Sequence, residues 1–412
     1  MIDNRMGDSG MEDNRIQDNR MEDKEDYLST LNERQLDAVT TTEGYVRIIA
    51  GAGTGKTKAL THRYAYLVNE LGISTSNILC VTFTNKAARE MSKRIRQMIG
   101  DSDTGYICTF HGFCVKLLRE DIHAINFPQN FVVMDDEDTE EILKTVYENA
   151  HIQSRTYTFD SARDHITALK SQMLHIPYLA EIGNEKLLAD YEKAAKVEDK
   201  VFLGYLYEQK KVYGLDYDDL ITIALYILQT DETKRIKWQE RMMYVMVDEF
   251  QDVSSSQYAL AEILSGYHRN LFIVGDPDQT IYTWRGAQIE YILEFDETHE
   301  NTRTIFLDMN YRSTPEILAV SNSLIEKNKK RLPHRLEAYK ESGRRPIYIH
   351  SRTTGDEAQW MTSEIQRLVS EGASYNEMAV LYRSHFVSRN IEESFIKAKI
   401  PVSYTHLTLP TN

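Results

Sequence analysis

A glycine-rich turn between an apolar run and a helix-forming stretch constrains the fold of this chain more than any other feature. The run Val46–Ala50 has the composition of a buried strand, and residues 56–71, which follow the turn, contain neither glycine nor proline. The glycines let the backbone curl so that its N–H groups face one point, where the following helix adds its dipole. This order of strand, turn and helix predicts a phosphate-binding loop in an α/β fold.

Each part of the turn has a task in holding a nucleotide. Lys56 supplies a point charge for the β- and γ-phosphates of ATP, and the Thr57 hydroxyl is a ligand for Mg²⁺. The predicted ATP-binding residues of this segment are Ala50, Gly51, Ala52, Gly53, Thr54, Gly55, Lys56 and Thr57. The alternative is a glycine turn without a ligand, which the strand before it and the helix after it disfavour.

Carboxylates at the end of a second apolar run complete the predicted site. The run that begins at Met243 ends in Asp248 and Glu249. Asp248 would hold the metal, and Glu249 would activate the attacking water. Alone, such a pair often marks only a strand that enters a solvated loop, but together with the phosphate loop it indicates nucleotide hydrolysis.

Apolar runs alternate with helical stretches, which predicts a parallel sheet covered by helices on both faces. The clearest runs are Val46–Ala50, Ile78–Phe83, Tyr244–Val247, Leu271–Val274 and Thr304–Leu307. Functional residues should gather at the carboxyl ends of these strands. After Tyr311 the alternation resumes, with expected helices at Pro315–Lys330, Glu357–Val369 and Ser388–Lys399 and expected strands at Ile347–His350 and Met378–Tyr382.

The net charge of −15 is unusual for a protein that binds nucleic acid. Residues 1–26 hold nine acidic and four basic side chains, so five of these negative charges belong to a repetitive segment that we expect to be disordered. A local groove can still bind DNA. Three cysteines without a CxxC pair argue against a zinc site or disulfides, and no apolar run approaches the ~20 residues that span a bilayer. We expect a soluble, cytoplasmic protein that does not contact a membrane.

With these motifs in order, the chain resembles the UvrD/PcrA/Rep helicases of superfamily 1 from about Leu31 to Val402. The most specific segments are VDEFQD from Val247, VGDPDQTIYTWRGA from Val274 and NYRSTPEIL from Asn310. The resemblance implies an ATP-dependent DNA helicase that moves 3′-to-5′ in DNA repair or replication. It implies ATP and Mg²⁺ as cofactors, and single-stranded and tailed duplex DNA as partners.

The resemblance also assigns nucleotide contacts. Gln35 is expected to read the adenine, Gln279 to sense the γ-phosphate, and Gln251 to belong to the same coupling network. Tyr311 is expected to stack on adenine and Arg312 to reach the γ-phosphate. The predicted catalytic residues are therefore Lys56, Asp248, Glu249, Gln279 and Arg312.

For DNA, the resemblance points to three base-stacking aromatic residues and four residues near the backbone. These are Phe83, Tyr282 and Trp284, and Thr84, Asn85, Thr109 and His111. Phe83 could instead belong to the sheet core, and His111 could be structural. A core role fits Trp284 poorly because it lies in a polar turn. A further basic set could be only a solvated helix face: Lys86, Arg89, Lys93, Arg94 and Arg96.

The expected organisation is a RecA-like ATP-binding domain in two parts, 27–122 and 213–310, with a helical insertion at 123–212 between them. A partial second RecA-like domain at 311–402 and an unmatched tail at 403–412 follow. Because the family continues beyond this point, we expect a truncated chain with weak DNA-stimulated hydrolysis and no strand separation. A motor subunit of a helicase-nuclease and a regulator that binds ATP and single strands without unwinding stay open as alternatives.

Overall fold

A computed structural model of the chain describes residues 27–100 and 103–403. The predicted disorder of residues 1–26 lies outside these ranges, as does the predicted tail beyond residue 403. The described residues form two compact units, which divide between Gly343 and Arg344. The predicted domain boundaries stay predictions. No helix in the described ranges is long and apolar enough to cross a membrane.

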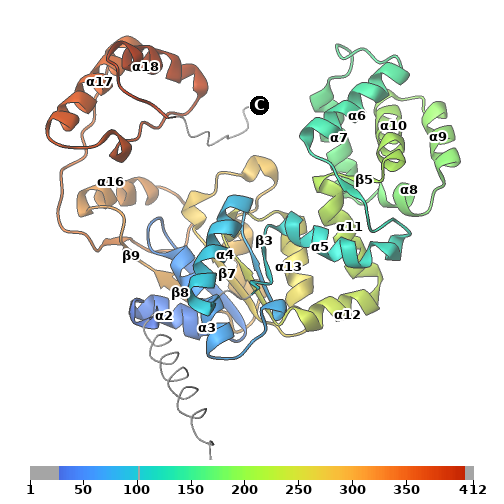
Figure 1. Cartoon of the computed structure of the whole chain (residues 1–412), viewed down its shortest axis with the longest axis horizontal. Coiled ribbons are helices and arrows are strands. Elements are labelled where there is room, and N and C mark those ends of the chain that lie inside the picture. The colour runs from blue at the N-terminus through green and yellow to red at the C-terminus, as the bar shows by residue number, and fades with distance from the viewer. Residues whose placement is uncertain (1–26, 101–102, 404–412) are drawn as a thin grey trace, which may run out of the picture. The chain divides into compact units, whose positions relative to one another are not determined.

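A six-stranded parallel sheet forms the centre of the first unit (Figure 1). Its strands are β1 (Tyr45–Ala50), β2 (Ile78–Val81), β3 (Tyr106–Cys108), β6 (Tyr244–Val247), β7 (Leu271–Gly275) and β8 (Arg303–Leu307). They lie in the order β3-β2-β6-β7-β1-β8, and every neighbouring pair is parallel. The predicted α/β fold with a parallel sheet is confirmed. Strand β3 was not predicted from the sequence, because its three residues are too few to show a recognisable apolar run.

Helices cover both faces of the sheet, as predicted, because both faces of its strands are apolar. Within β1, Ile48 and Ala50 enter one core, whereas Ile49 enters the other. The first core is covered by α2 (Glu33–Thr40), α3 (Lys56–Asn69) and α4 (Asn85–Ile99). The second is covered by α5 (Phe110–Asp121), η2 (Ile122–Ile125), α11 (Tyr217–Thr230), α12 (Glu232–Arg241), α13 (Ser255–Ser265), α14 (Glu290–Leu293) and α15 (Phe295–Thr298).

Short elements complete the rest of this unit. Single 3₁₀ turns are η1 (Thr75–Asn77), η3 (Phe250–Asp252), η4 (Pro277–Gln279) and η5 (Thr283–Arg285). After β8 the chain forms β9 (Met309–Asn310), α16 (Pro315–Ile325) and β10 (Glu337–Ala338), and β9 pairs with β10 in parallel. Helix α16 thus ends five residues before the predicted Lys330.

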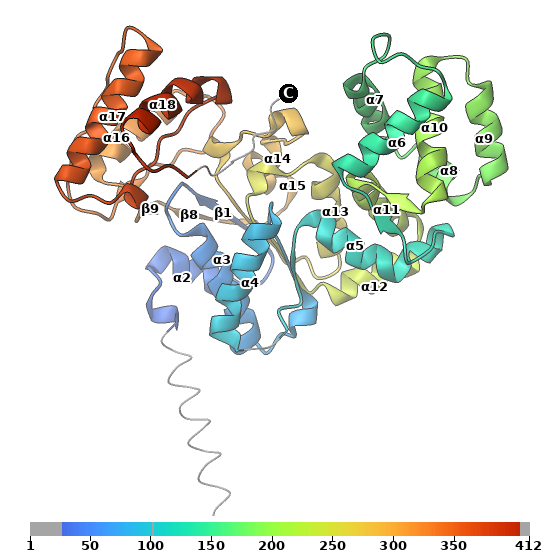
Figure 2. The ribbon, with the colours of Figure 1, turned by 45° about the horizontal axis from the view of Figure 1, so that its top comes forward.

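A set of helices between β4 (Val132–Val133) and β5 (Gly214–Leu215) packs around its own apolar core (Figure 2). These helices are α6 (Asp136–Asn149), α7 (Phe159–Ser171), α8 (Ile176–Ala180), α9 (Asn184–Lys193) and α10 (Val197–Lys211). The two short strands pair with each other in parallel. This pairing brings together the two points at which the chain leaves the sheet domain and returns to it.

The second unit has helices α17 (Thr354–Ser370) and α18 (His385–Lys397) and the turn η6 (Tyr375–Glu377). The prediction of strands at Ile347–His350 and Met378–Tyr382 is wrong, since both segments lack strand structure. A strand forms only when a neighbour completes its backbone hydrogen bonds, and the described part of this unit contains no partner strand.

A buried ion cluster joins helix α7 to the start of α11. The ammonium group of Lys170 lies 2.5 Å from Asp216 and 2.8 Å from Asp219, and the Lys170 and Asp219 side chains are fully buried. The Tyr205 hydroxyl also donates to Asp216, at 2.7 Å. Lys170 is the only cation among the described residues that pairs with both carboxylates, and its removal would leave the charge of Asp216 without a cation. Burial and the charge of Asp216 already raise the pKa of Asp219 to about 7.

We predict that Lys170→Met lowers the stability of the first unit by ~3 to 5 kcal/mol, seen as a fall of roughly 6 °C or more in its melting temperature. The matched control is Lys186→Met, which removes an exposed pair with Asp190 at 2.9 Å and should change stability by less than ~0.5 kcal/mol. Differential scanning calorimetry compares the two variants. Equal melting temperatures would contradict the assigned importance of the cluster.

Candidate functional site

The turn between β1 and α3 leaves its backbone N–H groups open. Gly53 and Gly55 have φ angles of 73° and 90°, in the region that favours glycine. A Cβ atom on Gly55 would lie 2.5 Å from the Gln35 amide nitrogen, so a side chain there would displace Gln35 from the loop as well as strain the backbone. Gly55 is the N-cap of α3 and has no side chain to cap it. The helix N-terminus therefore presents donors and a positive dipole end, which is the arrangement that binds phosphate.

Side chains from distant segments hold this loop in its conformation. The buried Gln35 amide donates to the Thr54 carbonyl at 3.0 Å, and the Asn310 amide donates to the Ala52 carbonyl at 2.5 Å. The Thr54 hydroxyl donates to the Gly51 carbonyl at 2.9 Å. In this structure Gln35 thus has a positioning contact with the loop, and its adenine-reading role stays a prediction.

The segment that begins at Asn310 lies against the loop. The Tyr311 backbone N–H donates to the Gly53 carbonyl at 2.9 Å, and the Asn32 amide donates to the Tyr311 hydroxyl at 2.6 Å. The side-chain oxygen of Asn310 accepts a hydrogen bond from the backbone N–H of Arg312 at 2.9 Å. Sequence reasoning did not single out Asn310, although it is the first residue of the NYRSTPEIL segment.

The loop lysine and the acidic end of β6 meet. The ammonium group of Lys56 lies 3.3 Å from a carboxylate oxygen of Glu249, and the Lys56 side chain is 12% exposed. Glu249 has a φ of 50°, which is uncommon for a residue with a side chain. Backbone strain of this kind is often found at functional sites. The structure therefore brings together Lys56 and Glu249 from strands that are not neighbours in the sheet.

Asp248 has the properties of a cation ligand. Its side chain is buried, and one carboxylate oxygen has no hydrogen-bond partner among the described residues. The other oxygen accepts from the Thr82 hydroxyl at 3.4 Å. Burial, and then the charge of Glu249, raise the pKa of Asp248 to about 6. A buried carboxylate oxygen without a donor fits Mg²⁺, which prefers hard oxygen ligands, and the predicted Thr57 hydroxyl at the start of α3 is of the same kind.

A chain of hydrogen bonds leads from the acidic site to the end of β7. The Gln251 amide donates to Glu249 at 2.9 Å, and its oxygen accepts from the backbone N–H of Asp276 at 3.0 Å. The Gln279 amide in turn donates to the Asp276 carboxylate at 2.5 Å. The network connects the predicted residues Gln251 and Gln279 through Asp276, which sequence reasoning missed although it lies in the VGDPDQ segment.

Three aromatic rings follow one another beside this network. The rings of Phe83 and Tyr282 are stacked with centroids 4.8 Å apart, and those of Tyr282 and Trp284 lie 6.3 Å apart. Trp284 is 50% exposed, so it is not a core residue. Strand β2 ends at Val81, and Phe83 is only half-buried. Phe83 is therefore not a fully buried strand residue, which was the alternative role considered for it. We call these three residues the aromatic ladder.

The predicted backbone-contact residues lie at two helix N-termini. The Thr84 hydroxyl accepts from the Ala87 N–H at the start of α4, and the Thr109 hydroxyl accepts from the Gly112 N–H at the start of α5, each at 3.1 Å. Asn85 is the exposed first residue of α4. The predicted residue His111 follows Thr109 in the first turn of α5. Its ring lies 5.3 Å from that of Tyr217, and burial lowers the pKa of His111, which disfavours the charged form of the ring.

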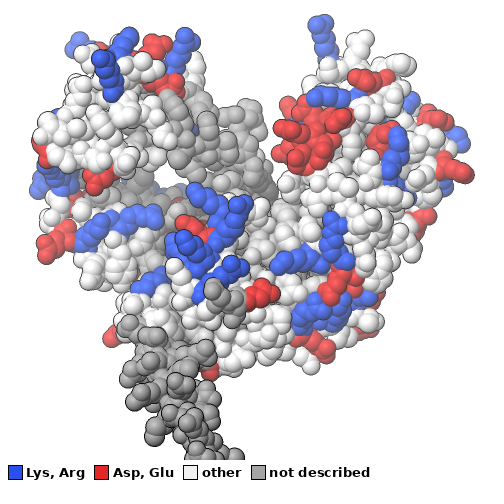
Figure 3. Space-filling view, in the orientation of Figure 1, with Lys and Arg blue, Asp and Glu red and all other residues white. Residues whose placement is uncertain are grey.

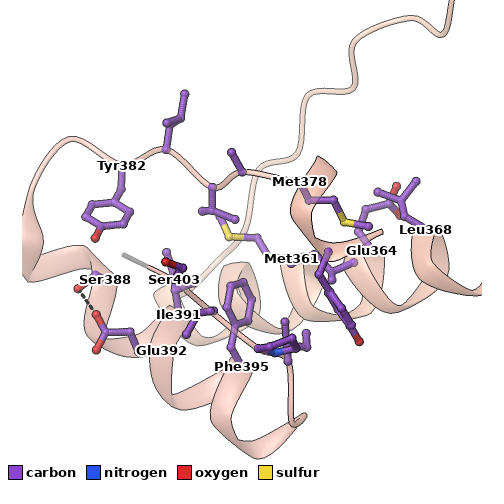
Figure 4. Close-up of a pocket in the computed structure, with 18 of the residues that line it drawn as sticks. Met361, Glu364, Leu368, Met378, Tyr382, Ser388, Ile391, Glu392, Phe395 and Ser403 are labelled. Carbon is purple, nitrogen blue, oxygen red and sulfur yellow. Dashed lines mark hydrogen bonds between the residues drawn. The ribbon is translucent and has the colours of Figure 1, made fainter. Parts of the chain in front are cut away.

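A cavity of about 890 Å³ lies in the second unit, between α17, α18 and the segment that contains Met378 and Tyr382 (Figure 4). Its walls are mainly apolar, with Met361, Ile391 and Phe395 among the lining residues. None of the predicted site residues lines it. All of the predicted site residues belong to the first unit instead, so the candidate site is at the edge of its sheet.

Comparisons with known proteins identify the family of the chain. Residues 31–300 match the UvrD/REP helicase N-terminal domain, and residues 305–408 match the UvrD-like helicase C-terminal domain. The ATP-dependent DNA helicase PcrA of Staphylococcus aureus is 38% identical over 375 residues, which cover 91% of this chain and 50% of the relative. PcrA of Staphylococcus epidermidis is 38% identical over 381 residues, with the same two shares.

The chain thus spans about half the length of the curated relatives that it matches. The resemblance drawn from the motifs is confirmed by both domain matches. Since the first match alone covers more than half of its residues, the chain belongs to the UvrD/REP helicase family.

Proposed function

We propose that this chain hydrolyses ATP at the loop between β1 and α3 and uses the cycle to move along single-stranded DNA, with 3′-to-5′ direction, as an ATP-dependent DNA helicase. The observation that carries the proposal is the continuous contact path from Lys56 through Glu249, Gln251 and Asp276 to Gln279. Four residues further along the chain from Gln279, the short turn η5 begins and carries Trp284 of the ladder.

In this proposal the open N–H groups of the loop bind the phosphates, and Lys56 adds the positive charge that the transferred phosphoryl group needs. Mg²⁺, held by Thr57 and Asp248, would neutralise further phosphate charge. Glu249 accepts a proton from the attacking water, and Gln251 keeps its carboxylate in place. The exposed Arg312 and the ring of Tyr311 lie on the segment that contacts the loop, where they can reach the γ-phosphate and adenine.

The aromatic ladder gives the DNA side of the proposal. Flat rings stack on any base, at about 1 to 3 kcal/mol per base, so a strand can shift by one position without a sequence penalty. Thr84, Asn85, Thr109 and His111 lie at helix N-termini, where phosphate is favoured. Single-stranded and tailed duplex DNA are the proposed partners, and the cytoplasmic location stays a prediction.

Replacement of the loop lysine tests the nucleotide site. We predict that Lys56→Ala abolishes ATP hydrolysis while the melting temperature stays within about 2 °C, because the charge is lost from the N-terminus of α3 rather than from an apolar core. The control is Lys58→Ala on the same helix, whose ammonium group contacts the Thr30 carbonyl and which should retain turnover within about threefold. Near-normal turnover by Lys56→Ala in a phosphate-release assay would refute the site.

Replacement of the proposed base separates binding from chemistry. We predict that Glu249→Gln binds ATP with near-normal affinity but loses at least ~100-fold in turnover, because the amide keeps the shape and cannot accept the proton. Titration with a fluorescent ATP analogue and a single-turnover assay measure the two properties. An equal loss of affinity and turnover would show that Glu249 is needed to build the site rather than for proton transfer.

Replacement of the exposed ladder residue tests the DNA site. We predict that Trp284→Ala weakens single-stranded DNA binding by ~1 to 3 kcal/mol, equally for oligomers of different sequence. Trp360→Ala is the matched control, because Trp360 is 39% exposed in the second unit and outside the ladder. Fluorescence anisotropy with labelled oligonucleotides compares both variants. Unchanged affinity of Trp284→Ala would show that this side chain does not contribute to DNA binding.

A further inference from the structure

Helix α4 carries a concentration of positive charge in an acidic chain. Its residues include the five basic side chains Lys86, Arg89, Lys93, Arg94 and Arg96, against one acidic residue, in a protein with a net charge of −15. Four of the five follow one another at spacings of three, four and three residues. At 3.6 residues per turn this spacing places them on one side of the helix, with Arg94 outside the row. We call Lys86, Arg89, Lys93 and Arg96 the α4 row.

The α4 row is open to an external partner. All four side chains are exposed, and none of them forms an ion pair with any residue that the structure describes. Other basic residues of the same unit are neutralised internally, such as Lys170 by Asp216 and Arg241 by Glu120. Figure 3 shows the Lys and Arg side chains gathered over α4. Exposed charges of one sign repel one another unless an anion binds there.

A groove runs beside the row, between α4 and the segment that leads into β3. It has a volume of about 730 Å³, and Arg89, Lys93 and Arg96 are among its lining residues. The Ser92 and Thr104 hydroxyls share a hydrogen bond of 2.8 Å across it, which joins the two walls. Asp103 is the acidic residue among the described lining residues. The charged side chains at the groove are therefore mainly basic, three against one, which suits a phosphate backbone.

The row begins where the aromatic ladder ends. Phe83 belongs to the ladder, Thr84 caps α4, and Lys86 is the first residue of the row. From Lys86 to Arg96 the helix rises by ~15 Å. A strand whose bases stack on the ladder would therefore meet Lys86 first if its backbone continued along α4.

We propose that the α4 row binds the sugar-phosphate backbone of the single DNA strand where it leaves the aromatic ladder, and so lengthens the DNA footprint of the first unit. The inference rests on the proposed function, since it takes the ladder to bind single-stranded DNA. Basic side chains add affinity without sequence readout, and each phosphate contact adds to the salt dependence of binding.

The test compares a short and a long oligothymidylate, of roughly 5 and 20 nucleotides, bound to the full chain. The variant replaces all four residues of the row with glutamine, which keeps helix propensity. Affinity for the long strand should fall at least tenfold, and affinity for the short strand should change by less than twofold. The slope of log affinity against log salt for the long strand should decrease by up to ~3, at about 0.7 per lost contact.

The control variant makes the same charge change elsewhere in the first unit, with Lys144, Lys186, Lys193 and Lys196 replaced by glutamine. Circular dichroism checks that both variants are folded. An unchanged salt slope for the α4 variant, or an equal loss in the control, would overturn the inference while leaving the ladder intact. If the unsubstituted chain binds neither oligonucleotide, the proposed function itself is wrong.

Discussion

The contact between Lys56 and Glu249 is the interaction on which the candidate site depends. The lysine follows β1 and the glutamate follows β6, and the two strands meet only through β7, which pairs with both. Because parallel strands all end at one edge, correct pairing of three strands is enough to bring the phosphate loop and the acidic pair together. The two apolar cores stabilise that strand pairing from both faces of the sheet. The geometry of the site therefore depends on the packing of the sheet.

Two residues at this edge, Glu249 and Asp248, have a backbone conformation or an environment that lowers the stability of the folded protein. Glu249 has left-handed backbone geometry, which costs on the order of 1 to 3 kcal/mol for a residue with a side chain. Asp248 is buried with one carboxylate oxygen without a donor, and its raised pKa reports the cost of keeping it charged. Both features lie next to the loop that we propose binds nucleotide. A cation bound by Asp248 would relieve the second cost, which would couple cation binding to the stability of the first unit.

The distribution of charge is compatible with the proposed binding and release of DNA. The whole chain is acidic, so long-range attraction to a polyanion is weak. The proposed stacking of bases on the aromatic ladder would be short-range and independent of sequence, and the α4 row places positive charge beside the ladder. The contact path from Glu249 to Gln279 runs into the segment that carries Tyr282 and Trp284. A change at the proposed nucleotide site would therefore have a short physical route to the rings on which we propose that bases stack.

The sequence by itself determined the local elements: the strand, turn and helix of the phosphate loop, the acidic end of β6, the parallel fold class and the aromatic residues of the ladder. All but the last follow from composition and spacing within a few residues, whereas the ladder residues follow from the resemblance to the helicase family. Tertiary structure alone decided the order of the strands, the roles of Asn310 and Asp276 as connectors, and the burial of Lys170. It also decided that residues 347–350 and 378–382 are not strands, because pairing needs a neighbour. Lys56 and Glu249 are 193 positions apart, and only folding sets which such residues meet, because side-chain contacts depend on strand order and packing rather than on neighbours in the chain.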